Sequence, residues 1–193
     1  MNQSDLDDIT KTLKGDGEAY ARLVGRYQNE MAARMWRFTR DHAELEELVQ
    51  DVFVEAYFSL RSYRATAPFL HWLNRIATRV GYRSWKKRQA QSAQAGGFDG
   101  WEGIVASRDN PLEPVQAADL LHSLMAQLGP RDRVVLTLLH LEELSVGEVA
   151  DRLGWSKTMV KVQAFRARKR LKALLEKQEA KFGGLLENSH ERN

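Results

Sequence analysis

The stretch from Glu143 to Leu171 most constrains the fold, because it has the pattern of two short helices around a tight turn. Ser145 and Glu148 have the spacing of a capping box, which starts a helix. Gly154 ends that helix, and Ser156 is placed to cap the next one. This pattern predicts a helix-turn-helix, a motif whose second helix enters the major groove of DNA.

The predicted second helix separates apolar and basic side chains. Val160, Ala164, Ala167 and Leu171 recur at helical spacing and predict a buried face. Phe165 lies well away from that face, and contact with bases or thymine methyl groups would explain an aromatic ring there. The alternative is an ordinary helix pair with a solvated basic face. The candidate contacts with duplex DNA are Lys157, Thr158, Lys161, Val162, Gln163, Phe165, Arg166 and Arg168.

The charge of the chain is segregated rather than large. There are 29 Lys and Arg against 26 Asp and Glu, which gives a net charge of +3. Acidic residues crowd residues 41–55, and basic residues crowd 75–88 and 157–172. Separate surfaces for nucleic acid and for another partner are therefore expected.

The absence of cysteine excludes disulfides, zinc–thiolate sites and cysteine nucleophiles. No apolar run reaches the length of about 18 residues that predicts a transmembrane helix. The acidic, polar N-terminus is unlike a signal peptide. These features favour a cytoplasmic protein.

Helical periodicity dominates the chain, and no convincing alternating strand is found. We predict an all-α fold with two small helical domains joined by a flexible linker, and with the helix-turn-helix in the C-terminal domain. The first domain is expected over residues 1–90, with a first helix that Ser4 and Asp7 could cap and that ends at residues 15–17, and with further helices near 18–40, 43–60 and 69–88. The second is expected over residues 118–177, followed by a frayed tail, residues 178–193.

Residues 91–117 lose periodicity and collect glycines and prolines, which predicts a linker. Trp101, Ile104 and Val105 are unusual in a free linker. Part of this segment is therefore expected to dock on another surface.

The predicted helix over residues 43–60 exposes carboxylates together with apolar side chains. Carboxylates alone would be a solvated face, whereas apolar residues among them are typical of a protein interface. No His follows at the i+3 spacing of a di-iron helix, so we expect no metal, no cofactor and no acid–base catalysis. The candidate partner-binding residues are Glu46, Glu47, Gln50, Asp51, Val54 and Phe58.

The predicted helix over residues 69–88 interleaves cations and aromatic rings on its exposed side. Cations neutralise phosphates, and rings stack on unpaired bases at roughly 1–3 kcal/mol each. The preceding loop, residues 61–68, has the composition to hold an extruded base. The alternative is that Trp72, Tyr82 and Trp85 belong to the domain core. The candidate contacts with melted DNA are Arg61, Tyr63, Arg64, His71, Trp72, Arg75, Arg79, Tyr82, Arg83 and Lys86.

Three segments together resemble the sigma-70 family of bacterial RNA polymerase sigma factors. Residues 45–53, LEELVQDVF, look like the acidic helix of that family, and residues 72–77, WLNRIA, look like the start of its −10 helix. Residues 128–171 are similar to its −35-binding domain, and Arg166-Ala167-Arg168 matches a recurrent triplet. Two domains with a short linker correspond to the compact layout of the extracytoplasmic-function (ECF) group.

This resemblance implies a transcription initiation factor that performs no chemistry itself. The acidic helix would bind the β′ clamp helices of core RNA polymerase, and the C-terminal domain would lie at the β flap. The helix over 69–88 and the loop before it would bind the melted −10 element, and the helix-turn-helix would bind the −35 duplex. The linker would run near the polymerase active site. A membrane-anchored anti-sigma factor is implied as a further partner.

The chain departs from the family pattern at several positions. Leu45 and Glu47 stand where alanine and aspartate are usual in the acidic motif, and Arg79 and Arg83 stand where asparagine and aspartate are usual in the −10 helix. Val162 replaces a common serine, which trades a hydrogen bond for apolar contact. The promoter sequence is therefore not carried over from a relative.

Two other classes of protein remain open. A stand-alone LuxR-like regulator shares much of the C-terminal pattern, but it would normally carry an α/β domain upstream. A helical-bundle hydrolase is the other alternative, although no nucleophile–base constellation supports an enzyme.

Overall fold

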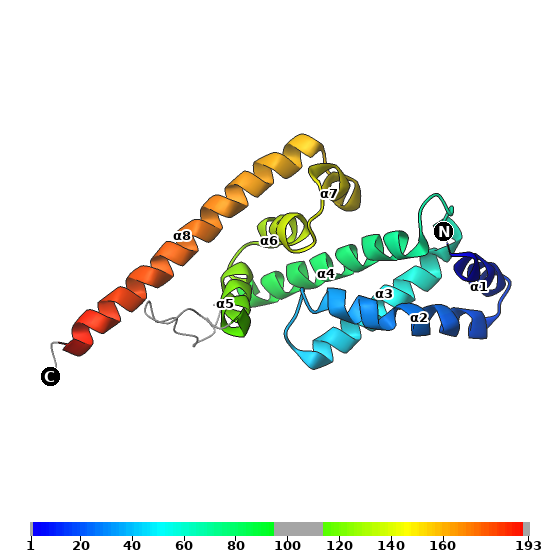
Figure 1. Ribbon diagram of the computed structural model, residues 1–193, viewed down its shortest axis with the longest axis horizontal. Coiled ribbons are helices and arrows are strands. Elements are labelled where there is room, and N and C mark those ends of the chain that lie inside the picture. The colour runs from blue at the N-terminus through cyan, green and yellow to red at the C-terminus, as the bar shows by residue number, and fades with distance from the viewer. Residues whose placement is uncertain (1, 95–113, 191–193) are drawn as a thin grey trace. The chain divides into compact units, whose positions relative to one another are not determined.

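The structure is a computed structural model that describes residues 2–94 and 114–190. Across these two ranges the chain forms helices and their connections, with no strand (Figure 1). It divides into two compact units, Met1–Arg88 and Gln89–Asn193. The predicted all-α fold with two helical domains is confirmed. Trp101, Ile104 and Val105, the residues expected to dock, lie outside the described residues.

The first unit is built from four helices, and polar side chains cap the N-termini of the first three. They are α1 (Gln3–Leu13), α2 (Gly17–Met35), α3 (His42–Ser59) and α4 (Phe69–Gln94), with a 3-10 turn at Leu60–Ser62. Asp16 accepts a hydrogen bond from the backbone of α2, and Asp41 does the same for α3. An acceptor at this position satisfies an N–H group that the helix leaves unpaired.

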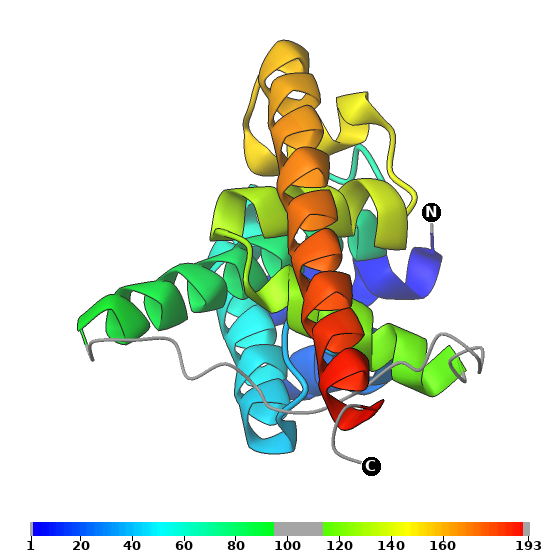
Figure 2. The same cartoon turned by 90° about the vertical axis from the view of Figure 1, so that its left-hand side faces the viewer.

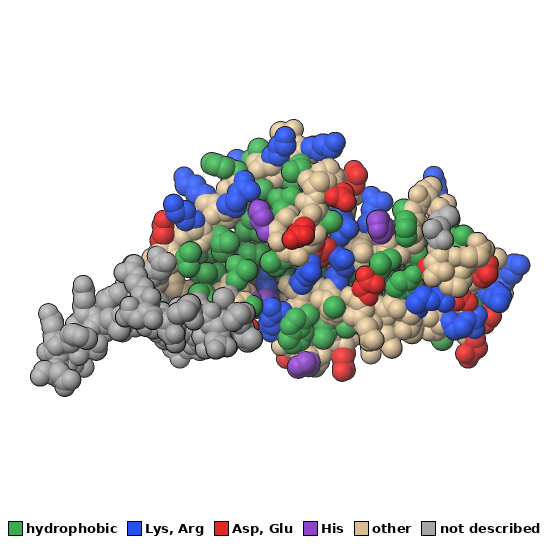
Figure 3. Space-filling model, in the orientation of Figure 1, with side chains coloured by type: hydrophobic (Ala, Val, Ile, Leu, Met, Phe, Trp, Pro, Cys, Tyr) green, Lys and Arg blue, Asp and Glu red, His purple; other side chains and the backbone are tan. Residues whose placement is uncertain are grey.

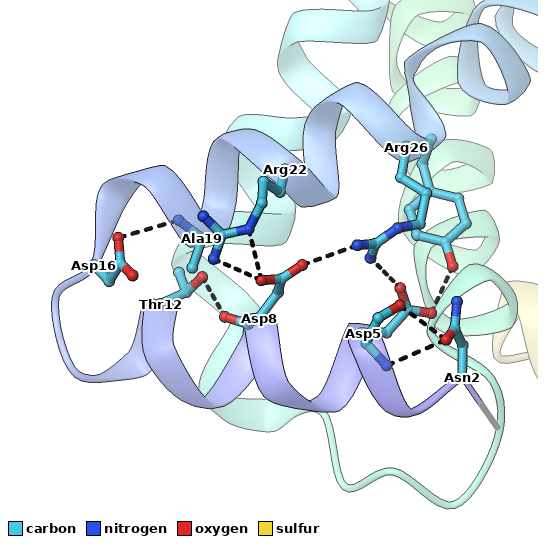
Figure 4. Close-up of polar contacts among 10 residues, drawn as sticks. Asn2, Asp5, Asp8, Thr12, Asp16, Ala19, Arg22 and Arg26 are labelled. Carbon is cyan, nitrogen blue, oxygen red and sulfur yellow. Dashed lines mark hydrogen bonds and ion pairs between the residues drawn. The ribbon is translucent and has the colours of Figure 1, made fainter.

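A network of carboxylates and guanidinium groups joins α1 to α2 (Figure 4). Asp5 and Asp8 are buried on α1. Asp8 accepts from Arg22 at 2.7 and 2.9 Å and from Arg26 at 2.9 Å, while Asp5 accepts from Arg26 and from the Tyr27 hydroxyl. Burial alone would raise the pKa of Asp8, but the hydrogen bonds from the two positively charged arginines outweigh it and hold that pKa below its ordinary value.

The second half of α4 is fixed to the corner between α2 and α3. The Phe38 and Trp85 rings lie 4.5 Å apart, and the indole N–H of Trp85 donates to the Phe38 carbonyl at 2.7 Å. Gly81 allows this close approach, because a Cβ atom there would overlap the Phe38 ring. Arg88 also reaches this corner, where it pairs with Glu44 at 2.8 Å. These contacts position the exposed face of α4.

The second unit packs its helices on one long helix (Figures 1 and 2). Its elements are α5 (Pro114–Ala126), α6 (Pro130–Leu136), a π-helical turn (Thr137–Leu141), α7 (Val146–Leu153) and α8 (Lys157–His190). A buried cluster from α5, the α5–α6 connection, α6 and α8 holds them together, and Leu171 and Leu174 pack against it. The cluster consists of Met125, Leu128, Leu136 and Ala167.

The predicted helix-turn-helix is present as α7 and α8. Ser145 and Glu148 form the reciprocal capping box, with the Glu148 carboxylate accepting from the Ser145 backbone at 2.9 Å. Gly154 follows α7 with a left-handed φ of +69°, which glycine adopts without steric cost. The Ser156 hydroxyl accepts from the backbone N–H of Met159 at 3.1 Å and caps α8.

Helices extend further than the sequence predicted at three places. Residues 91–94 continue α4 and residues 114–117 begin α5, so both ends of the expected linker are helical. Residues 178–190 continue α8 and do not form the expected frayed tail. Pro114 suits the first turn of a helix, because an N–H group there would have no acceptor within the helix and its absence costs nothing. The long α8 is not interrupted because no proline follows Pro130 in the sequence, and a glycine inside a helix costs only about 1 kcal/mol.

Candidate nucleic-acid and partner-binding surfaces

The outward face of α8 collects most of the residues expected to contact duplex DNA. Val160, Ala164 and Ala167 are buried, which turns the opposite side of the helix to solvent. Val162 is 44% exposed and Phe165 is 65% exposed. Figure 3 shows Lys and Arg side chains alternating with hydrophobic ones along the visible edge of α8. The exposed members of the expected set are Lys157, Thr158, Lys161, Val162, Phe165, Arg166 and Arg168.

Gln163 differs from the other expected DNA contacts because it is engaged within its own unit. It is half-buried, and its amide nitrogen donates to the carboxylate of Asp132 on α6. Asp132 is buried and also accepts from Arg170. Because a carboxylate only accepts, this bond fixes the amide nitrogen of Gln163 toward α6. The side chain of Gln163 is therefore bonded within the unit and does not join the exposed residues of the expected set.

Met159 is an exposed apolar residue on α8 that the sequence reasoning did not include. Its side chain is 36% exposed. Its position three residues before Val162 places it on the neighbouring part of the same outward face. This spacing was available in the sequence as a signal.

The expected contacts on α4 share one face of the helix. At about 100° per residue they fall in a sector roughly 120° wide, and Leu73, Ala77 and Val80 are buried on the other side. From His71 to Lys86 the face extends over about 22 Å of helix axis. The residues in this sector are His71, Trp72, Arg75, Arg79, Tyr82, Arg83 and Lys86.

Partners within the first unit hold several of these α4 side chains. Arg83 forms an ion pair with Glu55 on α3, and the Lys86 ammonium lies 5.9 Å from the centroid of the Tyr82 ring. Trp72 and Tyr82 are half-buried. Trp85 is buried, so the core interpretation is correct for this residue.

The loop before α4 is folded onto an aromatic cluster. The Tyr63 ring lies 5.5 Å from Phe69 and 5.6 Å from Trp72, and its hydroxyl donates to a backbone carbonyl of the loop at 2.7 Å. Arg61 and Arg64 are exposed on the same loop. The loop thus presents two guanidinium groups beside aromatic rings, which is the combination that binds single-stranded nucleic acid.

The exposed face of α3 combines carboxylates with apolar side chains. Phe58 is 80% exposed and Val54 is 51% exposed. Among the described residues, none forms an ion pair with a carboxylate of this face. A sector about 100° wide holds Glu47, Gln50, Asp51, Val54 and Phe58, with Glu46 at its border.

Tyr57 extends this α3 face and was missed from the sequence. It is 49% exposed, and the centroid of its ring lies 5.0 Å from that of Tyr20 and 5.9 Å from that of Phe58, both in T-shaped arrangements. The available signal was its place seven residues after Gln50, because residues seven apart lie on the same side of a helix.

The described parts of the chain contain no group of three or more His, Asp or Glu side chains that would hold a metal ion. Within the same parts, no helix combines the length and the apolar character needed to cross a membrane.

Comparisons with known proteins match both units. Residues 23–91 match sigma-70 region 2, and residues 118–171 match sigma-70 region 4. The ECF RNA polymerase sigma factor SigW of Bacillus subtilis is 27% identical over 176 residues, which cover 86% of this chain and 94% of SigW. The RNA polymerase sigma-H factor of Pseudomonas aeruginosa is 28% identical over 90% of this chain and 95% of its own length.

Solved structures share the fold. CnrH, in complex with the cytosolic domain of CnrY, superposes with a TM-score of 0.57 and 25% identity over 90% of this chain and 98% of CnrH. The sigma factor RpoE of Bartonella quintana, in complex with the anti-sigma factor NepR, has a TM-score of 0.57 and 22% identity over 81% of this chain and 96% of its own. The second likeness supports the fold alone.

Proposed function

The chain belongs to the ECF group of the sigma-70 family, and on this premise we propose that it binds core RNA polymerase and directs it to promoters. The polymerase performs the chemistry, and this chain supplies promoter recognition and helps to separate the strands. Region 2 corresponds to the unit with α3 and α4, and region 4 to the unit with the helix-turn-helix.

The observation that carries this proposal is the exposed face of α3. A stand-alone regulator has no need for a helix that exposes Phe58 and Val54 among carboxylates without ion-pair partners in the described residues. A protein partner with a complementary basic and apolar surface explains both features. We assign this face to the clamp helices of the polymerase β′ subunit.

The two basic faces are assigned to the two promoter elements. The outward face of α8 binds the −35 duplex, with Lys161, Val162 and Phe165 toward the bases and Arg166 and the other cations toward phosphates. The α4 face and the loop of residues 61–68 bind the melted −10 element. Extruding a base costs a few kcal/mol, which stacking on half-buried rings offsets.

Further partners follow from the same assignment. The second unit contacts the β flap, and an anti-sigma factor covers the DNA-binding faces when the protein is inactive. The solved relative CnrH is in complex with the cytosolic domain of CnrY, which is consistent with a protein partner for this chain. We propose that the anti-sigma factor of this chain is membrane-anchored and that the chain itself acts in the cytoplasm with the polymerase.

The polymerase assignment is tested by co-purification with core enzyme and by transcription in vitro with sequencing of the transcript starts. The variant Gln50→Ala with Asp51→Ala removes an amide and a carboxylate from the α3 face. It should lose association with core polymerase and transcription together. The matched control, Asn29→Ala with Glu30→Ala, removes the same groups from an exposed part of α2 and should leave both unchanged.

The same experiments distinguish the proposed function from the alternative, a stand-alone regulator. If the α3 variant still co-purifies with core polymerase as the wild type does, the α3 assignment is wrong. If the wild-type chain binds an operator as a dimer and never binds core polymerase, a stand-alone LuxR-like regulator is the better description.

A further inference from the structure

The outward face of α8 carries exposed apolar side chains that are not part of the hydrophobic core. Met159, Val162 and Phe165 are 36%, 44% and 65% exposed, while the inward stripe of the same helix is buried. Three exposed apolar residues within seven positions of one helix face form a patch, and such a patch marks a binding surface. We call these three residues the apolar ridge.

The ridge has the dimensions of a few base pairs. Its members follow each other at i, i+3 and i+6, so each is displaced by about 60° from the last over about 9 Å of helix axis. Base pairs follow each other about every 3.4 Å. A helix lying in the major groove would therefore bring the ridge against about three successive base pairs.

The exposed cations beside the apolar ridge favour an anionic partner. Lys161, Arg166 and Lys169 border it and are exposed, and no described residue pairs with them. The one amide in this part of α8, on Gln163, is held by Asp132 and points its nitrogen away. What remains is a row of apolar groups between cations.

The major groove of DNA fits this surface. Phosphates line its edges, and the C5-methyl group of thymine is the apolar feature on its floor. The ridge also lies in the first turns of the second helix of a helix-turn-helix, the part that enters the groove. An acidic amphipathic peptide matches the charges, but nothing in the position of the ridge favours it.

We propose that the apolar ridge reads the C5-methyl groups of thymines in the upstream promoter element, an inference that rests on the proposed −35 binding. Sequence preference at this element then comes mainly from methyl contacts over a short thymine-containing run. Of the bordering cations, Arg166 and Lys169 hold the phosphates and add affinity without sequence preference.

The test compares thymine with uracil, which has the same hydrogen-bonding groups and lacks only the methyl. The probes are duplexes enriched from a random upstream element by the full chain bound to core polymerase. Uracil in place of each thymine in the enriched run should weaken binding by about fourfold per methyl. Raising the salt concentration should lower the affinity for both duplexes and leave their ratio unchanged, because phosphate contacts depend on salt and methyl contacts do not.

Two variants assign the methyl contacts to the ridge. Val162→Ala should abolish the difference between thymine and uracil at one position of the run and leave the others. Lys169→Ala is the matched control at the border of the ridge. It should weaken binding to all duplexes and keep every thymine-to-uracil ratio.

The possible results separate this inference from the function on which it rests. An enriched element without thymines, equal affinity for thymine and uracil duplexes, or ratios that Val162→Ala does not alter would each overturn the methyl inference while leaving −35 binding intact. Failure to enrich any duplex would contradict the −35 assignment itself, and the inference with it.

Discussion

At the scale of single residues, the backbone adopts a left-handed conformation at a position that is not occupied by glycine. Glu143, between the π-helical turn and α7, has a φ of +52°. This left-handed region is unfavourable for a residue with a Cβ atom and costs roughly 1–2 kcal/mol. Glycine adopts it freely but loses more entropy on folding.

Replacing Glu143 with Gly should therefore stabilise the protein. The relief of strain exceeds the added entropy loss, so the free energy of unfolding should rise by about 0.5–1 kcal/mol. Chemical denaturation followed by circular dichroism measures this change. Glu143→Ala keeps the Cβ atom and should give no gain. Equal stabilisation by both variants would show that the side chain, rather than the backbone, is responsible.

Single residues also mark the limit of sequence analysis. The capping residues Ser145 and Ser156 were predictable because a cap acts within three residues of its helix. The bond from Gln163 to Asp132 joins residues 31 positions apart, and the ion pair from Arg83 to Glu55 spans 28. Nothing local in the sequence specifies such partners, so Gln163 was assigned to DNA without its internal bond.

At the scale of elements, the exposed face of each helix was predicted better than its length. Periodicity specifies which side of α3, α4 and α8 is buried, because an apolar stripe repeats over several turns. Helix ends have no such repeated signal, and the glycines at 183–184 were too weak a signal to end α8. Exposure of Tyr57 and Met159 depends on packing around them, which sequence periodicity does not describe.

The network between α1 and α2 predicts acid sensitivity of the first unit. The pKa of Asp8 is lower in the folded protein than in the unfolded chain, where it is about 3.9. Its contribution to stability is therefore complete above the unfolded pKa and is lost as the pH falls through the folded pKa. Thermal unfolding measured from pH 6 down to pH 2 should show this loss.

The variant Asp8→Asn isolates the contribution of this carboxylate. It should be less stable at neutral pH by on the order of 2 kcal/mol, because two arginines lose a charged acceptor, and its stability should depend less on pH. The matched control is Asp7→Asn, one residue away on the exposed side of α1. An acid transition unchanged in Asp8→Asn would contradict the role of this group.

The face of α4 predicts a selective effect on promoter opening. Arg75→Ala with Lys86→Ala removes two cations from the face assigned to melted DNA, so strand separation should fall more than binding to closed duplex. Permanganate footprints on promoter DNA with holoenzyme measure the opened bases. Lys87→Ala, a cation about 100° away around the same helix, is the control. Equal footprints from the double variant and from the wild type would contradict the assignment.

At the scale of the whole molecule, each unit has the parts it needs to fold separately. The first has its network of arginines on buried carboxylates and the Phe38–Trp85 contact, and the second has the cluster around Ala167. Each unit also carries the face that we assign to one promoter element. A division of this kind gives a polymerase subunit two modest DNA contacts whose combined effect exceeds either one alone.

Two units with separate cores should unfold in two transitions that variants shift independently. Gly81→Ala places a Cβ atom against the Phe38 ring and should lower only the transition of the first unit, by about 1–3 kcal/mol. Glu143→Gly should raise only the transition of the second. In calorimetry of the full chain, the double variant should show both shifts at their single-variant sizes. A single transition that responds to both changes would mean that the two units fold as one cooperative body.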